Sequence, residues 1–389
     1  MPAPPLDDAV LAETLAVYDR VGSYTGAARE LGVTESTVRA RVREARARGL
    51  HLSPGVRSAA ERLRLAGREV RGGWLHDYDP ETGRKLATLY WRAPEAEPED
   101  LAERVAAALA AVPPCPEVDF LPWAEPRREL CVVYPLFDLH FGMRAWGQET
   151  AGPDYDTGIA ARVLRDAAAA LLLSTRSAYR AILLLGGDTL HADDDTAQTP
   201  RHRHVLDVDS RHDKVLRATL EALEHFVVLL ARQHHEVVVK VLRGNHDESA
   251  CRVLKYALHA RFRDTRVQVD LGSDDFFMTN WGDNALFAYH GDRIPPQRAV
   301  FFFADVCPFW STTKHRIIYT GHYHKLQTED FGAAVVETVR PFAPADHWAA
   351  SSGYTSRPTL RADMFHATRG RVAVHTVALD QFLRDATGA

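Results

Sequence analysis

The chain has 389 residues, of which 46% are hydrophobic and 25% charged, the composition of an ordinary folded protein of two or three domains. This composition excludes a disordered or fibrous protein, and no apolar run approaches the ~18 residues that a membrane helix needs. The N-terminus lacks the pattern of a secretory signal, and the four cysteines form no Cys-x-x-Cys pair. We therefore expect a cytoplasmic protein without disulfides, without a thiolate zinc site and without membrane contact.

The net charge of −5 conceals an asymmetry along the chain. Residues 20–71 contain twelve Arg and five Glu but no Lys or Asp, a net charge of +7, so the rest of the chain sums to −12. A basic segment joined to an acidic body favours contact between that segment and a polyanion. A solvated helical surface has the same composition, so charge alone leaves the two interpretations open.

Residues 1–50 are predicted to form three short helices. Asp7 or Asp8 can cap the first, Ser23 the second over residues 24–31, and Thr34 the third, which Gly49 ends. Between the second and third helices, a small residue at Ala28, a turn glycine at Gly32 and a β-branched residue at Val38 occupy the positions that a helix-turn-helix requires.

This segment resembles the helix-turn-helix of bacterial regulators and phage DNA-binding proteins. The resemblance makes residues 1–50 a DNA-binding domain and the third helix its recognition helix. Arginine pairs with phosphate or with the guanine edge. The residues expected to contact DNA are Ser36, Thr37, Arg39, Arg41, Arg43 and Arg46. A plain protein-interaction domain is the alternative.

Residues 51–126 are predicted to connect this domain to the rest. A turn-rich stretch over 77–83 lies between two β-rich runs, which indicates a β-hairpin. An alanine-rich helix is expected over about 98–111, followed by five prolines between residues 113 and 126 that predict a stiff linker.

From Leu130 onward, five short apolar runs of strand length each lead into a loop that opens with residues able to bind metal. The loops are Asp138-Leu139-His140, Gly186-Gly187-Asp188, Gly244-Asn245-His246-Asp247, His290-Gly291-Asp292 and Gly321-His322-Tyr323-His324. Helices are expected between them over about 158–178, 213–235 and 249–262. In α/β sheets, sites assemble in the loops at the carboxyl ends of the strands.

Together these five motifs resemble the calcineurin-like metallophosphoesterases. Each motif is weak alone, but all five in order, each behind a strand, give a strong signal. If the resemblance were false, the histidines would be ordinary surface or core residues. The resemblance implies an α/β fold over residues 127–389, a β-sandwich flanked by helices.

The expected chemistry is hydrolysis of a phosphodiester, which needs a hydroxide at neutral pH and neutralisation of charge on phosphorus. Two divalent ions about 3.5–4 Å apart supply both. The resemblance assigns Asp188 to the bridging position between them. It assigns Asp138, His140 and His324 to one ion and Asn245, His290 and His322 to the other. This ligand set suits manganese, iron, zinc or cobalt, and the resemblance favours manganese.

Three further residues are expected to be catalytic. His246 resembles the family histidine that protonates the leaving oxygen or stabilises the transition state without binding metal. Asp247 either orients His246 by a hydrogen bond or caps the following helix. His191 matches a histidine that SbcD-type DNA-repair nucleases place near the scissile phosphate, although a loop histidine is often merely exposed.

The chain also resembles a narrower group, phage and prophage proteins that join a helix-turn-helix to a metallophosphoesterase domain. This resemblance includes Asp207-Val208-Asp209-Ser210-Arg211, Ala345-Asp346-His347-Trp348 and Gly353-Tyr354. Trp348 and Tyr354 either shape the site or pack in the core, and packing is the simpler expectation. Some relatives carry a second histidine where this chain has Asp292, whose role stays open. The loop over residues 192–214 is either a phosphate-contacting lid or a solvated charged loop.

The function predicted from these observations is a two-metal DNA nuclease that its N-terminal domain delivers to DNA. One alternative is a phosphatase or nucleotide phosphodiesterase that acts on small phosphoesters. Another is a DNA-binding regulator whose phosphoesterase domain has lost its activity, against which the complete ligand set argues.

Overall fold

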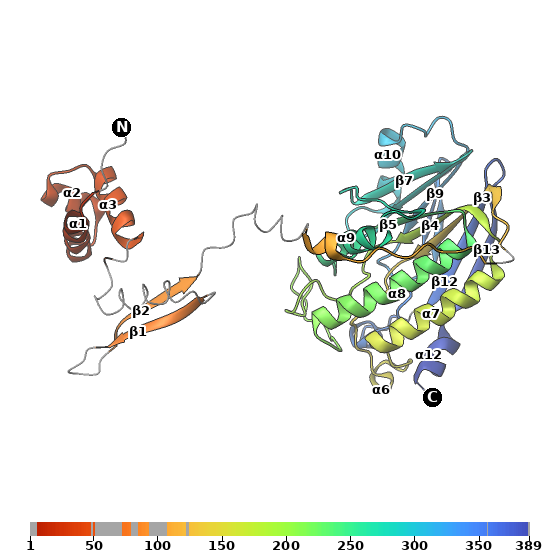
Figure 1. Ribbon diagram of the computed structural model, residues 1–389, viewed down its shortest axis with the longest axis horizontal. Helices are drawn as coiled ribbons and strands as arrows, with labels where there is room; N and C mark the ends of the chain where they lie inside the picture. Colours follow the sequence, from red (N-terminus) through yellow and green to blue (C-terminus); the bar gives the residue numbers. More distant parts are fainter. Residues whose placement is uncertain are drawn as a thin grey trace. The chain divides into compact units, whose positions relative to one another are not determined.

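The computed structural model describes residues 6–47, 50, 72–78, 85–92, 107–121, 124–355 and 357–387. The chain divides into two compact units, residues 1–104 and 105–389 (Figure 1). Most of the predicted turn over 77–83 and most of the predicted helix over 98–111 lie outside the described residues. Each unit is described by itself below.

The N-terminal unit begins with three helices, α1 (Asp8–Val21), α2 (Tyr24–Leu31) and α3 (Glu35–Ala47). The predicted caps are confirmed at Asp7, whose carboxylate accepts the Ala9 N–H, and at Ser23, whose hydroxyl accepts the Gly26 N–H. Gly32 ends α2 with a φ of 67°, a conformation that favours glycine. The helices share a small core of Leu11, Leu15, Ala27, Ala28, Val38, Val42 and Ala45.

A β-hairpin follows, as the sequence predicts. Strands β1 (Gly72–Tyr78) and β2 (Lys85–Arg92) pair antiparallel, from Gly72 opposite Arg92 to Tyr78 opposite Lys85.

The second unit is a sandwich of two sheets. The six-stranded sheet has the order β13-β12-β3-β4-β5-β6, in which β3 to β6 run parallel and β12 and β13 are antiparallel additions. Its strands are β3 (Arg127–Leu136), β4 (Ala178–Leu185), β5 (Glu236–Val241), β6 (Val267–Val269), β12 (Thr359–His366) and β13 (Gly370–Ala378).

The five-stranded sheet has the order β10-β11-β9-β8-β7, with β8, β9 and β11 parallel. Its strands are β7 (Phe276–Trp281), β8 (Asn284–Tyr289), β9 (His315–Thr320), β10 (Gln327–Asp330) and β11 (Val335–Thr338). Apolar side chains from the inner faces of both sheets, among them Val133, Ile182, Leu286 and Ile317, form one buried cluster between them.

Helices cover the outer faces of the sandwich (Figure 1). Those on the six-stranded sheet are α7 (Thr157–Ser174), α8 (His212–Gln233) and α9 (Ala250–Phe262), with α12 (Asp380–Thr387) against α7. Helix α10 (Pro296–Val306) packs on the five-stranded sheet. Alternate residues of β3 enter the two cores, Val132 and Tyr134 on one side and Val133 on the other, which explains why this strand is apolar throughout. The predicted α/β sandwich flanked by helices is confirmed.

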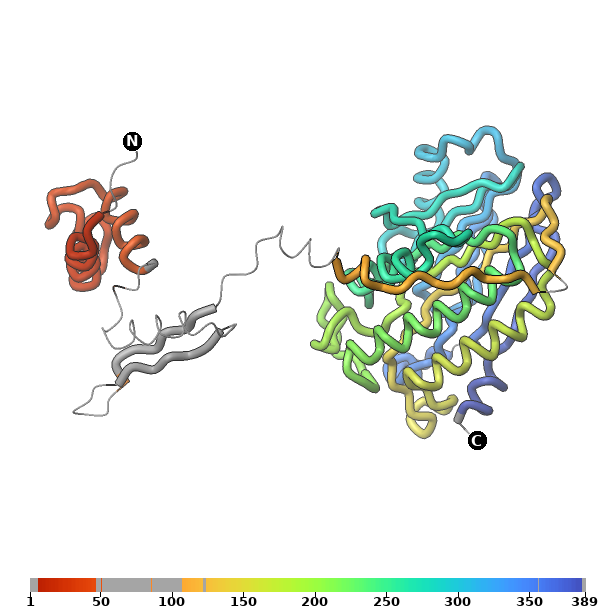
Figure 2. The backbone as a smooth tube through the Cα atoms, viewed as in Figure 1, coloured from red at the N-terminus to blue at the C-terminus, as the bar shows by residue number. Residues whose placement is uncertain are grey.

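The proline-rich segment was predicted as a stiff linker, and its described residues are attached to the second unit by hydrogen bonds. Residues 113–121 run along the second unit, beside α8 and α9 (Figure 2). The Cys115 N–H donates to the Arg261 carbonyl at 2.6 Å, and the Arg261 guanidinium donates to the Pro113 carbonyl at 2.7 Å. Because proline lacks an N–H but keeps its carbonyl, a proline-rich strip can still be fixed by donors from the body it crosses. The compact unit accordingly begins at Val105.

None of the described helices is both long and apolar enough to span a bilayer.

Candidate metal centre

Five loops meet at one edge of the sandwich, because the strands that precede them run parallel within each sheet. The strands β3, β4 and β5 of one sheet and β8 and β9 of the other end just before these loops. All five strands were predicted from the sequence. The residues that the loops carry are Asp138, His140, Asp188, Asn245, His246, His290, His322 and His324.

One group of donors comprises Asp138, His140 and His324, whose ligand atoms lie within 4.8 Å of one another. The Nε2 atoms of His140 and His324 are 3.2 Å apart, and His324 Nε2 lies 3.7 Å from Oδ1 of Asp138. Two imidazole nitrogens that face each other at this distance direct their lone pairs to the same point.

The second group comprises Asp188, His290 and His322. His290 Nε2 lies 3.2 Å from Oδ2 of Asp188 and 3.1 Å from Oδ1 of Asn245. The same Oδ2 lies 4.0 Å from His140 Nε2. Asp188 therefore lies between the two groups, the position that the resemblance assigns to a bridging carboxylate.

The backbone of these ligands is strained. Nine non-glycine residues of the described chain have positive φ, and five of them are predicted ligands. They are Asp138, His140, Asp188, His322 and His324, with φ between 46° and 69°. Such conformations cost of order 1–3 kcal/mol each and persist where the surrounding structure enforces them, typically at functional sites.

Glycine makes this close approach feasible at Gly244. A Cβ atom placed on Gly244 would lie 1.9 Å from Oδ1 and 2.3 Å from the backbone nitrogen of Asp188. The loops after β4 and β5 are thus in backbone contact, and no larger residue fits between them.

The protonation of the site favours cation binding. Burial and the neighbouring His246 ring lower the pKa of His140 well below its usual value, and burial lowers the pKa of His324 to about 4. Both rings are therefore neutral at pH 7, with lone pairs available. Burial also raises the pKa of Asp138 to about 7, so this carboxyl ionises readily only beside a positive charge.

The contact between Asp188 and His290 also shows that this part of the site stabilises positive charge. Burial acts to lower the pKa of His290, but the adjacent Asp188 charge outweighs it and raises the pKa to about 10. His290 Nδ1–H donates to the Gly186 carbonyl at 3.0 Å, so Nε2 is the nitrogen left to face Asp188. The positive charge stabilised at this point is one that a divalent cation would replace.

The donors present fit two divalent cations. They are carboxylate, amide and imidazole groups, of which Asp138, His140, Asp188 and His290 are buried and the others half-buried, and all four cysteines are free thiols buried elsewhere. Such nitrogen and oxygen sets suit manganese, iron, cobalt or zinc. Uncompensated carboxylates in so dry a place would be unfavourable, which a bound cation would correct.

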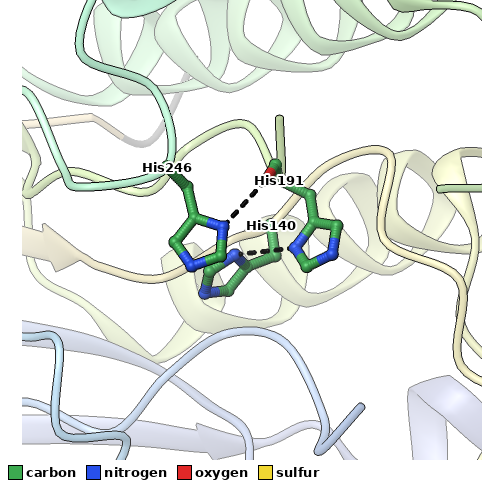
Figure 3. A group of neighbouring side chains, drawn as sticks. All are labelled: His140, His191 and His246. Carbon is green, nitrogen blue, oxygen red and sulfur yellow. Dashed lines mark hydrogen bonds between the residues drawn. The ribbon is translucent and has the colours of Figure 1, made fainter. Parts of the chain in front are cut away.

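A third group of close ligand atoms contains His140, His191 and His246 (Figure 3). His191 Nδ1 lies 3.2 Å from His140 Nδ1, and His246 Nδ1–H donates to the His191 carbonyl at 2.8 Å. If His140 keeps the Nε2 lone pair for a cation, its proton lies on Nδ1 and His191 accepts it. The proton of His191 then lies on Nε2, which is buried and has no hydrogen-bond partner. His191 is buried, and in this it differs from an ordinary loop histidine, which is exposed to solvent.

Asp247 has a different role from either one predicted. Its buried carboxylate accepts four backbone N–H groups, those of Asp188, Thr189, Leu190 and Gly244, at 2.8–3.2 Å. It therefore neither orients the His246 ring nor caps α9. It fixes the backbone of the Asp188 loop and is a positioning residue.

The start of α9 is capped instead by a residue that the sequence analysis did not assign. Oδ1 of Asp193 accepts the N–H groups of Ser249 and Ala250 at 2.8 and 2.7 Å. The spacing of 56 residues between Asp193 and Ser249 explains why no local motif revealed this cap.

Asp292, whose role the sequence left open, is neutralised by Arg243. The two side chains form two contacts, at 3.1 and 3.2 Å, and both are largely buried. Arg243 immediately precedes the Gly244 loop, so this ion pair ties the loops after β5 and β8 together.

The loop over residues 192–214 folds back onto the segment that follows His140. The Arg144 N–H donates to the Asp207 carbonyl, and the Asp209 N–H donates to the Gly142 carbonyl. A cavity of about 440 Å³ opens between them, lined in part by Phe141, Ala192 and Arg211. The arginines and histidines at 201–204 of this loop are exposed to solvent.

In the N-terminal unit, α3 presents an exposed stripe. Ser36, Arg39, Arg43 and Arg46 are exposed at spacings of three and four residues, while Thr37 and Arg41 are half-buried. Arg39 is held by Glu35 at 2.8 Å and lies over the Tyr24 ring, and Arg46 lies 3.8 Å from Asp19.

No protein-family model and no curated protein matches the sequence. Solved structures align with part of the chain at low TM-scores. Zinc-complexed Vps29 of Entamoeba histolytica is 13% identical, with 64% of this chain and 99% of that chain covered and a TM-score of 0.28.

Two further structures give similar values. An archaeal phosphodiesterase is 12% identical, covering 64% of this chain and 99% of its own, with a TM-score of 0.31. A predicted phosphoesterase of Streptococcus pneumoniae is 9% identical, with coverages of 65% and 99% and a TM-score of 0.25. Scores this low carry no inference about activity, so the proposal below depends on the site itself.

Proposed function

We propose that this chain is a two-metal phosphodiester hydrolase whose substrate is DNA. The observation that supports the hydrolase is the convergence of oxygen and nitrogen donors from five strand ends, several of them held in left-handed backbone. We take manganese as the preferred ion. The ligands would be Asp138, His140 and His324 for one ion, Asn245, His290 and His322 for the other, and Asp188 for both.

Divalent cations at this place would neutralise charge on a phosphate and lower the pKa of water towards neutrality. The chain's own residues supply positioning and proton transfer. The Nδ1–H of His246 donates to the His191 carbonyl, so in the imidazolium form the ring would carry its second proton on Nε2 and could give it to a leaving sugar oxygen. His191 would act through its neighbours, since its Nδ1 lies 3.2 Å from His140 Nδ1 and its carbonyl accepts the His246 Nδ1–H.

The proposed test uses full-length protein stripped with a chelator and reloaded separately with Mn²⁺, Zn²⁺, Co²⁺, Fe²⁺ or Mg²⁺. Substrates are a chromogenic diester, the matching monoester, and end-labelled linear, circular and single-stranded DNA. We expect diester and DNA cleavage to return with a transition metal, and product lengths will separate exonuclease from endonuclease action. Turnover of the monoester without DNA cleavage would favour a phosphatase, and DNA binding without any turnover would favour a regulator.

We propose that DNA is held by the exposed stripe of α3, on the model of the phage proteins that the sequence resembles. Its arginines supply several positive charges on one face of a helix that a major groove can accept. Arg39 and Arg46 are partly neutralised within the unit, so Arg43 is the stripe arginine with the most charge free for a phosphate.

The double variant Arg39→Ala with Arg43→Ala should bind DNA about tenfold or more weakly, because contacts of this kind contribute about 1–3 kcal/mol. The slope of log affinity against log salt should fall by about 2. Hydrolysis of the chromogenic diester should not change, since α3 contributes no donor to the metal groups. Fluorescence anisotropy across a salt series measures both quantities, and unaltered DNA affinity would remove α3 as the DNA-binding surface.

A further inference from the structure

Two large aromatic side chains lie exposed on the segment that follows β11. Trp348 is 69% exposed and Tyr354 is 62% exposed, so neither packs in the core as the sequence analysis expected. Their rings are nearly parallel, with centroids 6.0 Å apart and an angle of 24° between the planes. Two exposed aromatic rings that are already held nearly parallel to each other are typical of a contact surface.

The pair is held by the backbone around it. Trp348 lies on the short helix α11 (His347–Ser351), whose cap is the Asp346 carboxylate accepting the Ala349 N–H at 2.8 Å. Gly353, with a φ of 78°, turns the chain, and the Tyr354 N–H donates to the Ala349 carbonyl at 2.8 Å. A partner that stacks on these rings therefore meets a preformed surface, which reduces the entropy lost on binding.

The same segment is fixed to the metal centre. The Ala343 N–H donates to the backbone carbonyl of Asp138, and the Phe342 N–H donates to that of Phe137, both at 3.1 Å. Trp348 follows Ala343 by five residues, a reach of at most about 18 Å.

A second link joins the aromatic pair to the ligand loops. Helix α11 contacts α6 (Gly147–Thr150), the helix in the loop that carries His140. His347 on α11 lies 3.9 Å from the Glu149 carboxylate on α6. The aromatic pair thus lies within a few nucleotides of the place where a phosphate would be cleaved.

The chemistry of the surface favours a nucleobase. Helix α11 buries none of its residues. The exposed face of an aromatic ring suits a flat π-system, and base stacking on protein aromatics contributes about 1–3 kcal/mol per base. Arg340 and Arg357 flank the segment in sequence, and a nucleic-acid strand would need positive charge of this kind for its phosphates.

We propose that Trp348 and Tyr354 form a stacking platform for an unpaired base of the strand being cleaved, so that this protein prefers single-stranded ends or gaps over intact duplex. This proposal rests on the proposed function, whose DNA substrate it narrows to DNA with an unpaired base in the strand being cleaved.

The test compares two proteins, the Arg39→Ala, Arg43→Ala variant as the parent chain and the same variant with Trp348→Ala added. In this background, α3 does not dominate the affinity for DNA. Loss of stacking should raise the KM for a single-stranded oligonucleotide by roughly 5- to 150-fold, with little change in kcat. Trp348→Tyr should restore most of the affinity, and hydrolysis of the chromogenic diester should be unchanged. The matched control is Phe301→Ala, which removes another exposed aromatic side chain, on α10.

A binding measurement separates this proposal from the hydrolase. In the presence of a chelator, the single-stranded oligonucleotide should quench tryptophan fluorescence in the parent chain and quench it less in Trp348→Phe. Quenching without any hydrolysis under loaded conditions would overturn the hydrolase and leave the platform standing. Equal oligonucleotide affinity in Trp348→Ala and the parent chain, or equal loss of affinity for blunt duplex and single strand, would overturn the platform.

Discussion

Replacing Asp188 with Asn is expected to lower the rate of phosphodiester hydrolysis by at least about 10³-fold, or ~4 kcal/mol of transition-state stabilisation. Asp188 is the carboxylate that approaches both donor groups, through one oxygen at 3.2 Å from His290 and 4.0 Å from His140. The amide keeps the volume but removes the negative charge that would hold two cations together. Metal content should therefore also fall, measured per chain after dialysis against a limiting concentration of Mn²⁺.

The matched control for this variant is Asp270→Asn, a carboxylate that pairs with Lys240 at 2.9 Å and belongs to none of the donor groups. It should keep both its metal and its activity. A second comparison is Gly244→Ala. This variant removes no donor side chain, but its added methyl group would collide with Asp188. If Asp188→Asn retained two metal ions and full activity, the hypothesis that Asp188 binds both ions would be wrong.

His246→Ala is the second variant with a large expected effect. It should lower kcat by about 10²–10⁴-fold, the usual contribution of a positioned acid or base, while metal content stays at the level of the parent chain. The reason is that the His246 ring makes its hydrogen bond to the His191 carbonyl, whereas the backbone N–H of His246 contacts Asp188 and survives the substitution.

One outcome would contradict this prediction, because His246 also belongs to the group of possible metal ligands with His140 and His191. Loss of metal together with loss of activity would make His246 a ligand and not a proton donor. His225→Ala, an exposed histidine on α8, serves as the control for non-specific loss of a histidine. With a substrate whose leaving group needs no proton, the kcat of His246→Ala should lie closer to the kcat of the parent chain.

The positions of the candidate ligands could be predicted because the sequence signal for each one is local. A short apolar run followed by Asp, Asn or His describes a buried strand and the loop at its carboxyl end, and parallel strands bring such loops to one edge. The five strands that carry the loops were predicted, as were the helices at α7, α8 and α9. Strands β6, β7 and β10 to β13 were not, since most are short or lie at the sheet edges with mixed burial.

Other features depended on partners far along the chain. The four N–H groups on Asp247 include three that lie 57–59 residues away, so its positioning role left no local trace. The proline-rich segment was predicted as a linker from composition, but donors of Arg261, 148 residues away, hold it against the second unit. Trp348 and Tyr354 looked like core residues by type, yet no element of the described part of the chain covers them.

The sequence by itself determined the chemistry available to this protein: the donor types, their order, the strands that present them and a basic helical N-terminus. Only the tertiary structure decided how these donors are oriented, which carboxylate lies between the two groups, and which aromatics reach water. The physical reason is that residue type and short-range periodicity specify strands and helices, whereas left-handed backbone at five ligands and long-range hydrogen bonds are imposed by packing of the whole sandwich.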